Sequence, residues 1–179
     1  MKEIIIGIDP GVRGAVAIIV NGALKVYDLQ CCYKKTGASN SLNPSLFYKL
    51  ITNHVPLMDD NVTVFCEESQ VIGGGGIRAS IKSLRSIFDA RGVMRAVLWT
   101  RGYEINYVQP QNWKRALKLL GHTKFDSVEK ACQVFPESKN LFWKTRAKRD
   151  IPLDGRAEAA LIAHYGWCAV HNDSHAKTK

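Results

Sequence analysis

Two acidic residues directly follow apolar runs of sequence. A charged carboxylate is costly to bury in such apolar surroundings. Asp9 ends the run Ile4–Ile8, whose branched side chains predict a strand buried on both faces. Glu67, which Glu68 follows, comes directly after a similar run, Val62–Cys66. If the two strands are parallel neighbours, their carboxyl ends meet at the sheet edge where α/β proteins place their sites.

A second pair of acids lies near the end of the chain. Asp154 and Glu158 are four residues apart, so they share one face of a predicted helix. Alanines, Leu161 and Ile162 surround Glu158, which predicts that this helix is buried against the sheet. Two like charges on a buried helix repel each other, and a divalent cation with oxygen ligands removes the conflict.

Each acid also has a simpler interpretation. Asp9 can cap the Pro-Gly turn that follows it, and Asp154 can serve as an ordinary helix N-cap. Glu158 can pair with Arg156 or Arg149. One of the two adjacent glutamates faces away from the other, because successive residues of a strand alternate between faces.

Taken together, the four acids favour metal chemistry. They come without a histidine or cysteine ligand, which indicates a hard cation, most simply two Mg²⁺ or Mn²⁺ ions. Such a pair can activate water and stabilise the departing oxyanion of a phosphodiester.

The elements that must position these acids predict one α/β domain. Three strands open the chain as an antiparallel meander with an Asn21–Gly22 hairpin turn, and later strands follow helices and are expected parallel to the first. The predicted strands are Glu3–Asp9, Gly14–Val20, Leu24–Leu29, Val62–Cys66 and Tyr103–Val108; the predicted helices begin at Pro44 and then span Ile77–Thr100, Gln111–Leu120, Phe125–Phe135 and Gly155–Ala169.

The remaining segments are expected to be irregular. We predict a polar surface loop over Lys34–Asn43, a flexible glycine-rich segment over Ser69–Gly76 and a basic connector over Pro136–Pro152. The domain is expected to cover residues 1–170, followed by a polar tail over 171–179.

Composition narrows the class of partner. The formal net charge of +9, with 25 Lys and Arg against 16 Asp and Glu, favours a polyanion such as nucleic acid over a membrane surface. No apolar run reaches the ~20 residues that span a bilayer. Five cysteines without CxxC spacing favour reduced thiols and a cytoplasmic location.

Two basic segments are candidate DNA contacts. Lys114 follows Trp113 after Pro110, and the simplest interpretation is a buried tryptophan with a solvated lysine. The residues that extend the basic character are Arg115, Lys118 and Lys124 in this region and Arg78 and Lys82 on the long helix, where a solvated face is the usual meaning of such charges.

The order of these motifs resembles a known family. The chain resembles the RuvC-like Holliday junction resolvases, especially those of bacteriophages. The motifs that carry the resemblance are Gly-Ile-Asp-Pro-Gly at 7–11 with Gly14, Glu67 at a strand end, Val-x-Pro-x-x-Trp-Lys at 108–114 and Asp-Gly-Arg-Ala-Glu-Ala-Ala-Leu-Ile-Ala at 154–163. The resemblance extends from Ile4 to Tyr165.

This resemblance implies a ribonuclease H-like fold with a five-stranded mixed sheet, and a homodimer that cuts two strands of a four-way DNA junction. It implies that Asp9, Glu67, Asp154 and Glu158 hold the metals, Glu67 being preferred to Glu68, and that Lys114 and Lys124 contact DNA. The source implied is a phage gene, acting in the host cytoplasm. Cellular members of the family often carry aromatic residues after the glutamate, and Ser69–Gly76 has none.

Two other functions fit the same sequence. A ribonuclease H-like nuclease acting on RNA–DNA hybrids, flaps or forks needs the same acids, whereas a non-catalytic junction-binding protein does not, since acids repel phosphate. An actin-like kinase starts with a similar strand and turn but needs a second domain, for which 179 residues leave no room, so no nucleotide cofactor is expected.

Overall fold

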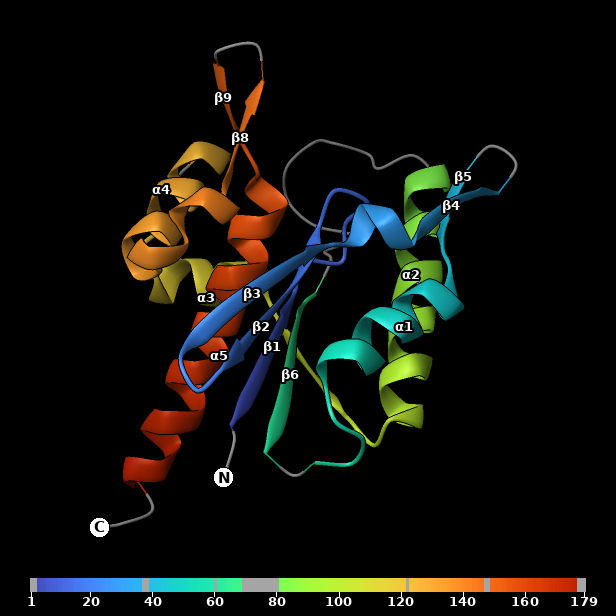
Figure 1. Ribbon diagram of the computed structural model, residues 1–179, viewed down its shortest axis with the longest axis horizontal. Helices are drawn as coiled ribbons and strands as arrows, with labels where there is room; N and C mark the ends of the chain where they lie inside the picture. The colour runs from blue at the N-terminus through green and yellow to red at the C-terminus, as the bar shows by residue number, and fades with distance from the viewer. Residues whose placement is uncertain are drawn as a thin grey trace.

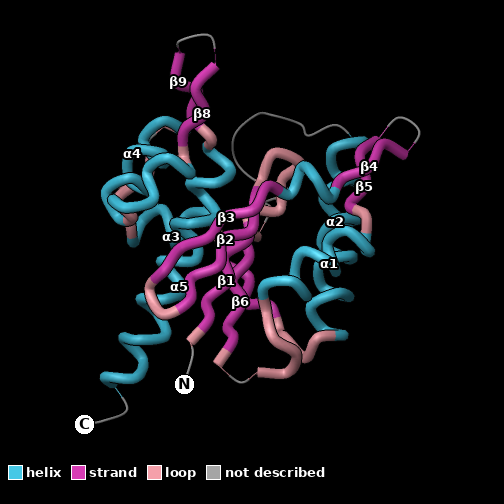
Figure 2. Tube along the Cα trace, in the orientation of Figure 1, coloured by secondary structure: helices cyan, strands magenta, loops and turns pink. Residues whose placement is uncertain are grey.

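A five-stranded sheet with strand order β3-β2-β1-β6-β7 forms the centre of the molecule. The computed structural model describes residues 3–36, 39–59, 61–68, 81–121, 123–146 and 149–176. Helices cover both faces of the sheet, with α1 and α2 on one side and α3, α4 and α5 on the other (Figures 1 and 2). The described helices include none that is long and apolar enough to cross a membrane.

The elements occur in the following order. The sheet contains β1 (Ile4–Ile8), β2 (Ala15–Val20), β3 (Ala23–Asp28), β6 (Val62–Glu67) and β7 (Ile105–Val108). The α-helices are α1 (Pro44–His54), α2 (Ile81–Thr100), α3 (Pro110–Ala116), α4 (Lys124–Val134) and α5 (Asp154–Ala176), and the 3₁₀ helices are η1 (Leu29–Cys32) and η2 (Pro136–Leu141). Two separate hairpins are formed by β4 (Tyr33–Thr36) with β5 (Ser39–Leu42) and by β8 (Trp143–Arg146) with β9 (Arg149–Pro152).

The predicted meander and mixed sheet are confirmed. β1, β2 and β3 pair in antiparallel fashion, and β6 is parallel to both β1 and β7. Asn21 and Gly22 have φ values of 48° and 84°, as expected for a two-residue hairpin turn that needs positive φ at both positions.

The register of β1 against β6 places two acids side by side. Ile8 lies opposite Cys66, so the next residues along the two parallel strands, Asp9 and Glu67, emerge at the same edge of the sheet. That edge lies far from both chain termini in Figure 1.

Alternation along β1 divides the core between two faces. Ile4, Ile6 and Ile8 are buried in the cluster that contains α1 and α2. Ile5 belongs to the other cluster, with the alanine-rich face of α5. This two-sided burial explains why the strand has a continuous apolar sequence rather than an alternating one.

Gly7 allows α5 to lie directly on β1. A Cβ atom at Gly7 would lie 2.3 Å from the backbone nitrogen of Ala163 and 2.4 Å from the carbonyl oxygen of Ala159. Both neighbours are backbone atoms of a buried helix, so they have no flexible side chain that could yield. The glycine therefore sets how closely Glu158, on the same helix, approaches the strand that leads to Asp9.

Two segments predicted to be irregular are β-hairpins. The expected surface loop over Lys34–Asn43 contains most of β4 and β5, and the expected connector over Pro136–Pro152 contains η2, β8 and β9. The loop prediction for Lys34–Asn43 is wrong, and the strands within the basic connector were not predicted, because all four short strands are largely polar and lack the apolar alternation by which a strand is recognised. The two hairpins project from the same end of the molecule in Figure 1, which is also the end at which β1 finishes.

Several helix boundaries also differ from prediction. α3 ends at Ala116 rather than Leu120, and Lys118 just beyond it has a φ of 59°, which a continuing helix does not permit. α5 continues to Ala176, beyond the predicted end at Ala169. The glycine-rich segment Ser69–Gly76 and the expected helix start at Ile77 lie outside the described residues.

The same substitution at two glycines should have opposite effects on stability. Gly7→Ala forces the new Cβ against the backbone of α5 and should lower the free energy of unfolding by at least about 1–3 kcal/mol. Gly92→Ala, within α2, meets nothing within 4 Å and should raise it by about 0.5–1 kcal/mol. Urea denaturation of the two variants measures both; equal effects would show that β1 and α5 are not packed as described.

Candidate active site

Asp9 lies at the carboxyl end of β1 and is held by its own turn. Its backbone N–H donates to the carbonyl of Ala15 at 3.1 Å, and one carboxylate oxygen accepts from the Gly11 N–H at 3.2 Å. A Cβ at Gly14 would lie 2.0 Å from the Asp9 carbonyl oxygen, so only glycine fits at this position, where the chain turns back past Asp9. The turn-cap interpretation is thus correct for one oxygen, and Asp9 also faces other acids.

Glu67 is oriented by a buried tryptophan. The indole Nε1–H of Trp113, which is fully buried in α3, donates to Glu67 Oε2 at 2.9 Å. Glu68 turns to other partners, accepting from the Gln109 side chain at 3.0 Å and lying 4.0 Å from Arg91. The structure therefore brings Glu67, rather than Glu68, toward Asp9, as strand alternation requires.

Lysines pair with both of the predicted site acids of α5, Asp154 and Glu158. The Lys114 ammonium lies 3.2 Å from Glu158, and Lys124 forms an ion pair with Asp154. Asp154 is the first residue of α5, and its carboxylate accepts a hydrogen bond from the Lys124 ammonium. The pairing of Glu158 with Arg156, considered from the sequence, is not observed, because Arg156 binds Asp28 instead.

Burial and like charge raise the proton affinity of the acids. Burial raises the pKa of Asp9 to about 7, and the nearby carboxylates of Glu67 and Glu158 add to this increase. Burial also raises the pKa of Glu67, while the hydrogen bond from Trp113 opposes that change. The hydrogen bond with Asp154 raises the pKa of Lys124, which keeps the lysine charged. The site thus contains more negative charge than is favourable at a sheet edge that is largely shielded from water.

Of the other predicted basic residues, the structure describes the side chains of Arg115 and Lys118. Arg115 is exposed on α3, and Lys118 is exposed just beyond that helix. Lys82 lies in α2, but its side chain is outside the described part of the structure, as is the whole of Arg78. Among the predicted basic residues whose side chains the structure describes, Lys114 and Lys124 are the two that contact the acids.

The donor chemistry of the cluster fits a hard divalent cation. Asp9, Glu67, Asp154 and Glu158 offer only carboxylate oxygens, and such oxygens are the ligands of Mg²⁺ and Mn²⁺. Among the described residues, no three acidic, histidine or cysteine side chains are close enough together to hold a metal as they stand. The ammonium groups of Lys114 and Lys124 balance part of the negative charge of the acids. To share a cation, the carboxylates would have to move closer together.

Structure comparison relates the fold to known proteins. RuvC of Thermus thermophilus in complex with a Holliday junction substrate has 15% sequence identity and a TM-score of 0.50, with 90% of this chain and 91% of that chain covered. A second Thermus thermophilus RuvC structure has 13% identity and a TM-score of 0.53, with 93% and 96% covered. The chain has a RuvC-like, ribonuclease H-like fold. No protein-family model and no curated protein matches its sequence.

Within this RuvC-like fold, several contributors were not identified from the sequence. Trp113 was expected to be buried, and it is, but its indole also orients Glu67. Tyr33 donates from its hydroxyl to the Pro10 carbonyl at 2.9 Å and so fixes the turn after Asp9. An isolated tyrosine 23 positions after its acceptor carries no local signal of this contact.

The charge cluster should leave a signature in the pH dependence of stability. Asp9 titrates near 3.8 when unfolded and near 7 when folded, so between these values the folded state keeps a proton that the unfolded state has lost. Without added metal, stability should therefore fall as pH rises from about 4 to 7, by up to about 1.4 kcal/mol per pH unit from this group.

Urea denaturation across this pH range, in the presence of a chelator, measures the slope. Asp9→Asn should flatten it, whereas Glu68→Gln, which removes a carboxylate outside the cluster, should leave it unchanged. A wild-type protein that becomes more stable over the same interval would contradict the electrostatic account.

Proposed function

We propose that this chain is a divalent-metal-dependent endonuclease that resolves four-way DNA junctions by paired nicks. The observation that carries the proposal is the meeting of Asp9, Glu67 and Glu158 at one sheet edge, beside Asp154 and two lysines, in a RuvC-like fold. A protein that only binds DNA gains nothing from acids that repel phosphate.

The four acids are proposed to hold Mg²⁺ or Mn²⁺, most simply as a pair. When bound, the metals would supply an activated water and charge for the departing oxyanion, which leaves 5′-phosphate and 3′-hydroxyl ends. Trp113 keeps Glu67 in one orientation, and the Gly11 amide does the same for one oxygen of Asp9. Lys114 and Lys124, freed from their acids, are in position to contact the phosphates of the cut strand.

The surface around the site supports DNA as the substrate. Arg115 on α3 and Lys118 just beyond that helix extend the positive charge, and Arg78 and Lys82 remain predicted contacts. The two hairpins add exposed Lys34 on β4 and Lys144 on β8, at the end of the molecule where the acids lie (Figure 1). Basic groups distributed in this way suit backbone contacts along the arms of a junction.

A homodimer would place two such sites on opposed strands. In α2, Phe88 and Trp99 are 55% and 53% exposed, and Gly92 and Arg95 complete a stripe at helical spacing. Large apolar side chains exposed on one helix face favour association with another protein surface. The two-fold symmetry of a dimer matches the near two-fold symmetry of a junction. The free thiols of the described cysteines suit the cytoplasm as its location.

Cleavage of a synthetic four-way junction tests the proposal. With Mg²⁺ or Mn²⁺, the wild-type protein should make symmetric nicks in two opposed strands, mapped by end-labelling each strand. An RNA–DNA hybrid, a flap and a fork serve as comparison substrates. Single nicks confined to these would favour a different ribonuclease H-like nuclease, and junction binding without any cleavage would favour a binding protein.

Asp9→Asn should separate binding from chemistry. The substitution removes a charge but keeps the shape of the side chain, so junction affinity should be kept while the cleavage rate falls by more than about 100-fold. Glu68→Gln should cleave at close to the wild-type rate, because Glu68 lies outside the cluster. Full cleavage by Asp9→Asn would contradict the assignment of the metal site.

A further inference from the structure

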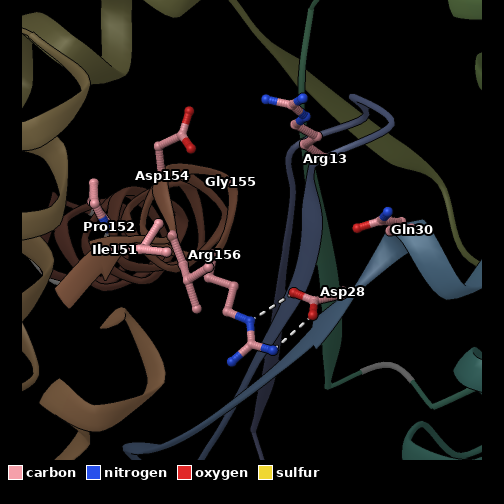
Figure 3. A pocket seen from close by; sticks show the side chains of 9 residues that line it. Arg13, Asp28, Gln30, Ile151, Pro152, Asp154, Gly155 and Arg156 are labelled. Carbon is pink, nitrogen blue, oxygen red and sulfur yellow. Dashed lines mark hydrogen bonds and ion pairs between the residues drawn. The ribbon is translucent and has the colours of Figure 1, made fainter. Parts of the chain in front are cut away.

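A cavity lies beside Asp154, bounded by the turn between β1 and β2, the start of α5 and the base of the β8–β9 hairpin. Its walls include Arg13, Gln30, Pro152 and Asp154, together with the Asp28–Arg156 pair. In Figure 3 the Asp154 carboxylate and the Arg13 guanidinium lie at one end of the cavity, and the Asp28–Arg156 pair lies at the other. The cavity therefore shares Asp154 with the proposed catalytic site.

The walls of this cavity are held firmly in place. Arg156 donates from Nε to Asp28 Oδ1 at 2.6 Å and from Nη2 to Oδ2 at 2.7 Å, and its Nη1 donates to the Leu141 carbonyl at 3.2 Å. A Cβ at Gly155 would lie 2.1 Å from the Arg13 carbonyl oxygen, so the first turn of α5 rests against the β1–β2 turn. A preformed space of this kind does not have to be ordered by the ligand.

The charges of the walls leave one cation available. Arg156 neutralises Asp28, and Lys124 pairs with Asp154. The exposed Arg13 guanidinium makes no hydrogen bond or ion pair with any residue in the described part of the chain. A free guanidinium offers a planar fork of donors that matches the oxygens of a phosphate.

A DNA strand that enters the catalytic site must also cross its surroundings. Each nucleotide carries a phosphate, so a scissile phosphate at the acids has charged neighbours on either side. Lys114 and Lys124 reach the cluster from α3 and α4, whereas Arg13 lies in the β1–β2 turn and lines the cavity beside Asp154. The cavity measures about 240 Å³, below the ~300–1,000 Å³ typical of pockets that enclose a drug-sized ligand, and this size suits one unit of an extended strand.

We propose that this cavity holds the nucleotide adjacent to the scissile phosphate, with Arg13 bound to the phosphate of that nucleotide. Gln30 lines the same cavity and can hydrogen-bond to the sugar or base. Arg13 then acts as a positioning residue, because it fixes the strand through a phosphate that does not react. The inference rests on the proposed function and adds to it a subsite with a stated ligand.

Neutral backbone substitutions in the junction test the subsite. One phosphate at a time near the mapped nick is replaced by a methylphosphonate, and single-turnover cleavage by the complete protein is measured. For the wild type, one replacement next to the nick should reduce the rate roughly 10-fold, because a charge-assisted hydrogen bond is lost. Arg13→Ala should lose a similar factor on unmodified DNA and nothing further on the junction with that methylphosphonate.

Matched variants identify the cause of any loss. Lys49→Ala removes a positive charge from an exposed position on α1, distant from the site, and should keep both the wild-type rate and the wild-type sensitivity to methylphosphonate. Arg13→Lys keeps a charge without the fork and should retain part of each. Thermal unfolding of the variants shows whether they remain folded.

Two outcomes would overturn the inference separately from the proposed function. If the wild type cleaves junctions but Arg13→Ala behaves like Lys49→Ala, the subsite is absent and the nuclease remains. The subsite is also absent if Arg13→Ala and each adjacent methylphosphonate reduce the cleavage rate independently, so that the two fold-losses multiply when they are combined. If the wild type cleaves no junction with Mg²⁺ or Mn²⁺, the proposed function fails first.

Discussion

Desolvation of carboxylates that lie near one another is the constraint on which the rest of this structure depends. Asp9 lies near Glu67 and Glu158 at one sheet edge, and burial, with a smaller contribution from these two carboxylates, raises the pKa of Asp9 to about 7. Lys114 and Lys124 offset part of this charge, and Trp113 gives Glu67 a hydrogen bond. An arrangement that opposes its own stability is typical of a functional site, where strain is retained for chemistry or binding.

The fold brings these acids together through close backbone contacts. The parallel register of β1 and β6 sets Asp9 beside Glu67, and Gly7 lets α5 lie against β1 so that Glu158 faces the same edge. Gly155 and the Arg156–Asp28 pair then fix the first turn of α5, which contains Asp154. Contacts this tight leave little room for side chains, which accounts for the small residues along the shared surface.

Sequence reasoning reached the elements whose signals are local. Apolar runs identified β1 and β6 with the acids that follow them, and the four-residue spacing put Asp154 and Glu158 on one helix face. The two hairpins were not predicted, because β4, β5, β8 and β9 are short, largely polar strands without an alternation of apolar and polar residues. The Arg156–Asp28 pair joins residues 128 positions apart, and the contacts of Trp113 with Glu67 and Tyr33 with Pro10 are also non-local. No spacing rule reveals such contacts, since they arise from tertiary packing.

The central claim is that the acids form a binding site for a divalent cation. The metal dependence of stability at pH 8 tests this claim most directly. The melting temperature of the wild-type protein should rise with Mn²⁺ concentration, by an amount that corresponds to about 2.7 kcal/mol at one hundred times the dissociation constant. The double variant Asp9→Asn, Glu158→Gln should melt higher than the wild type without metal and respond little to Mn²⁺. An equal rise in both proteins, or none in the wild type, would contradict the account.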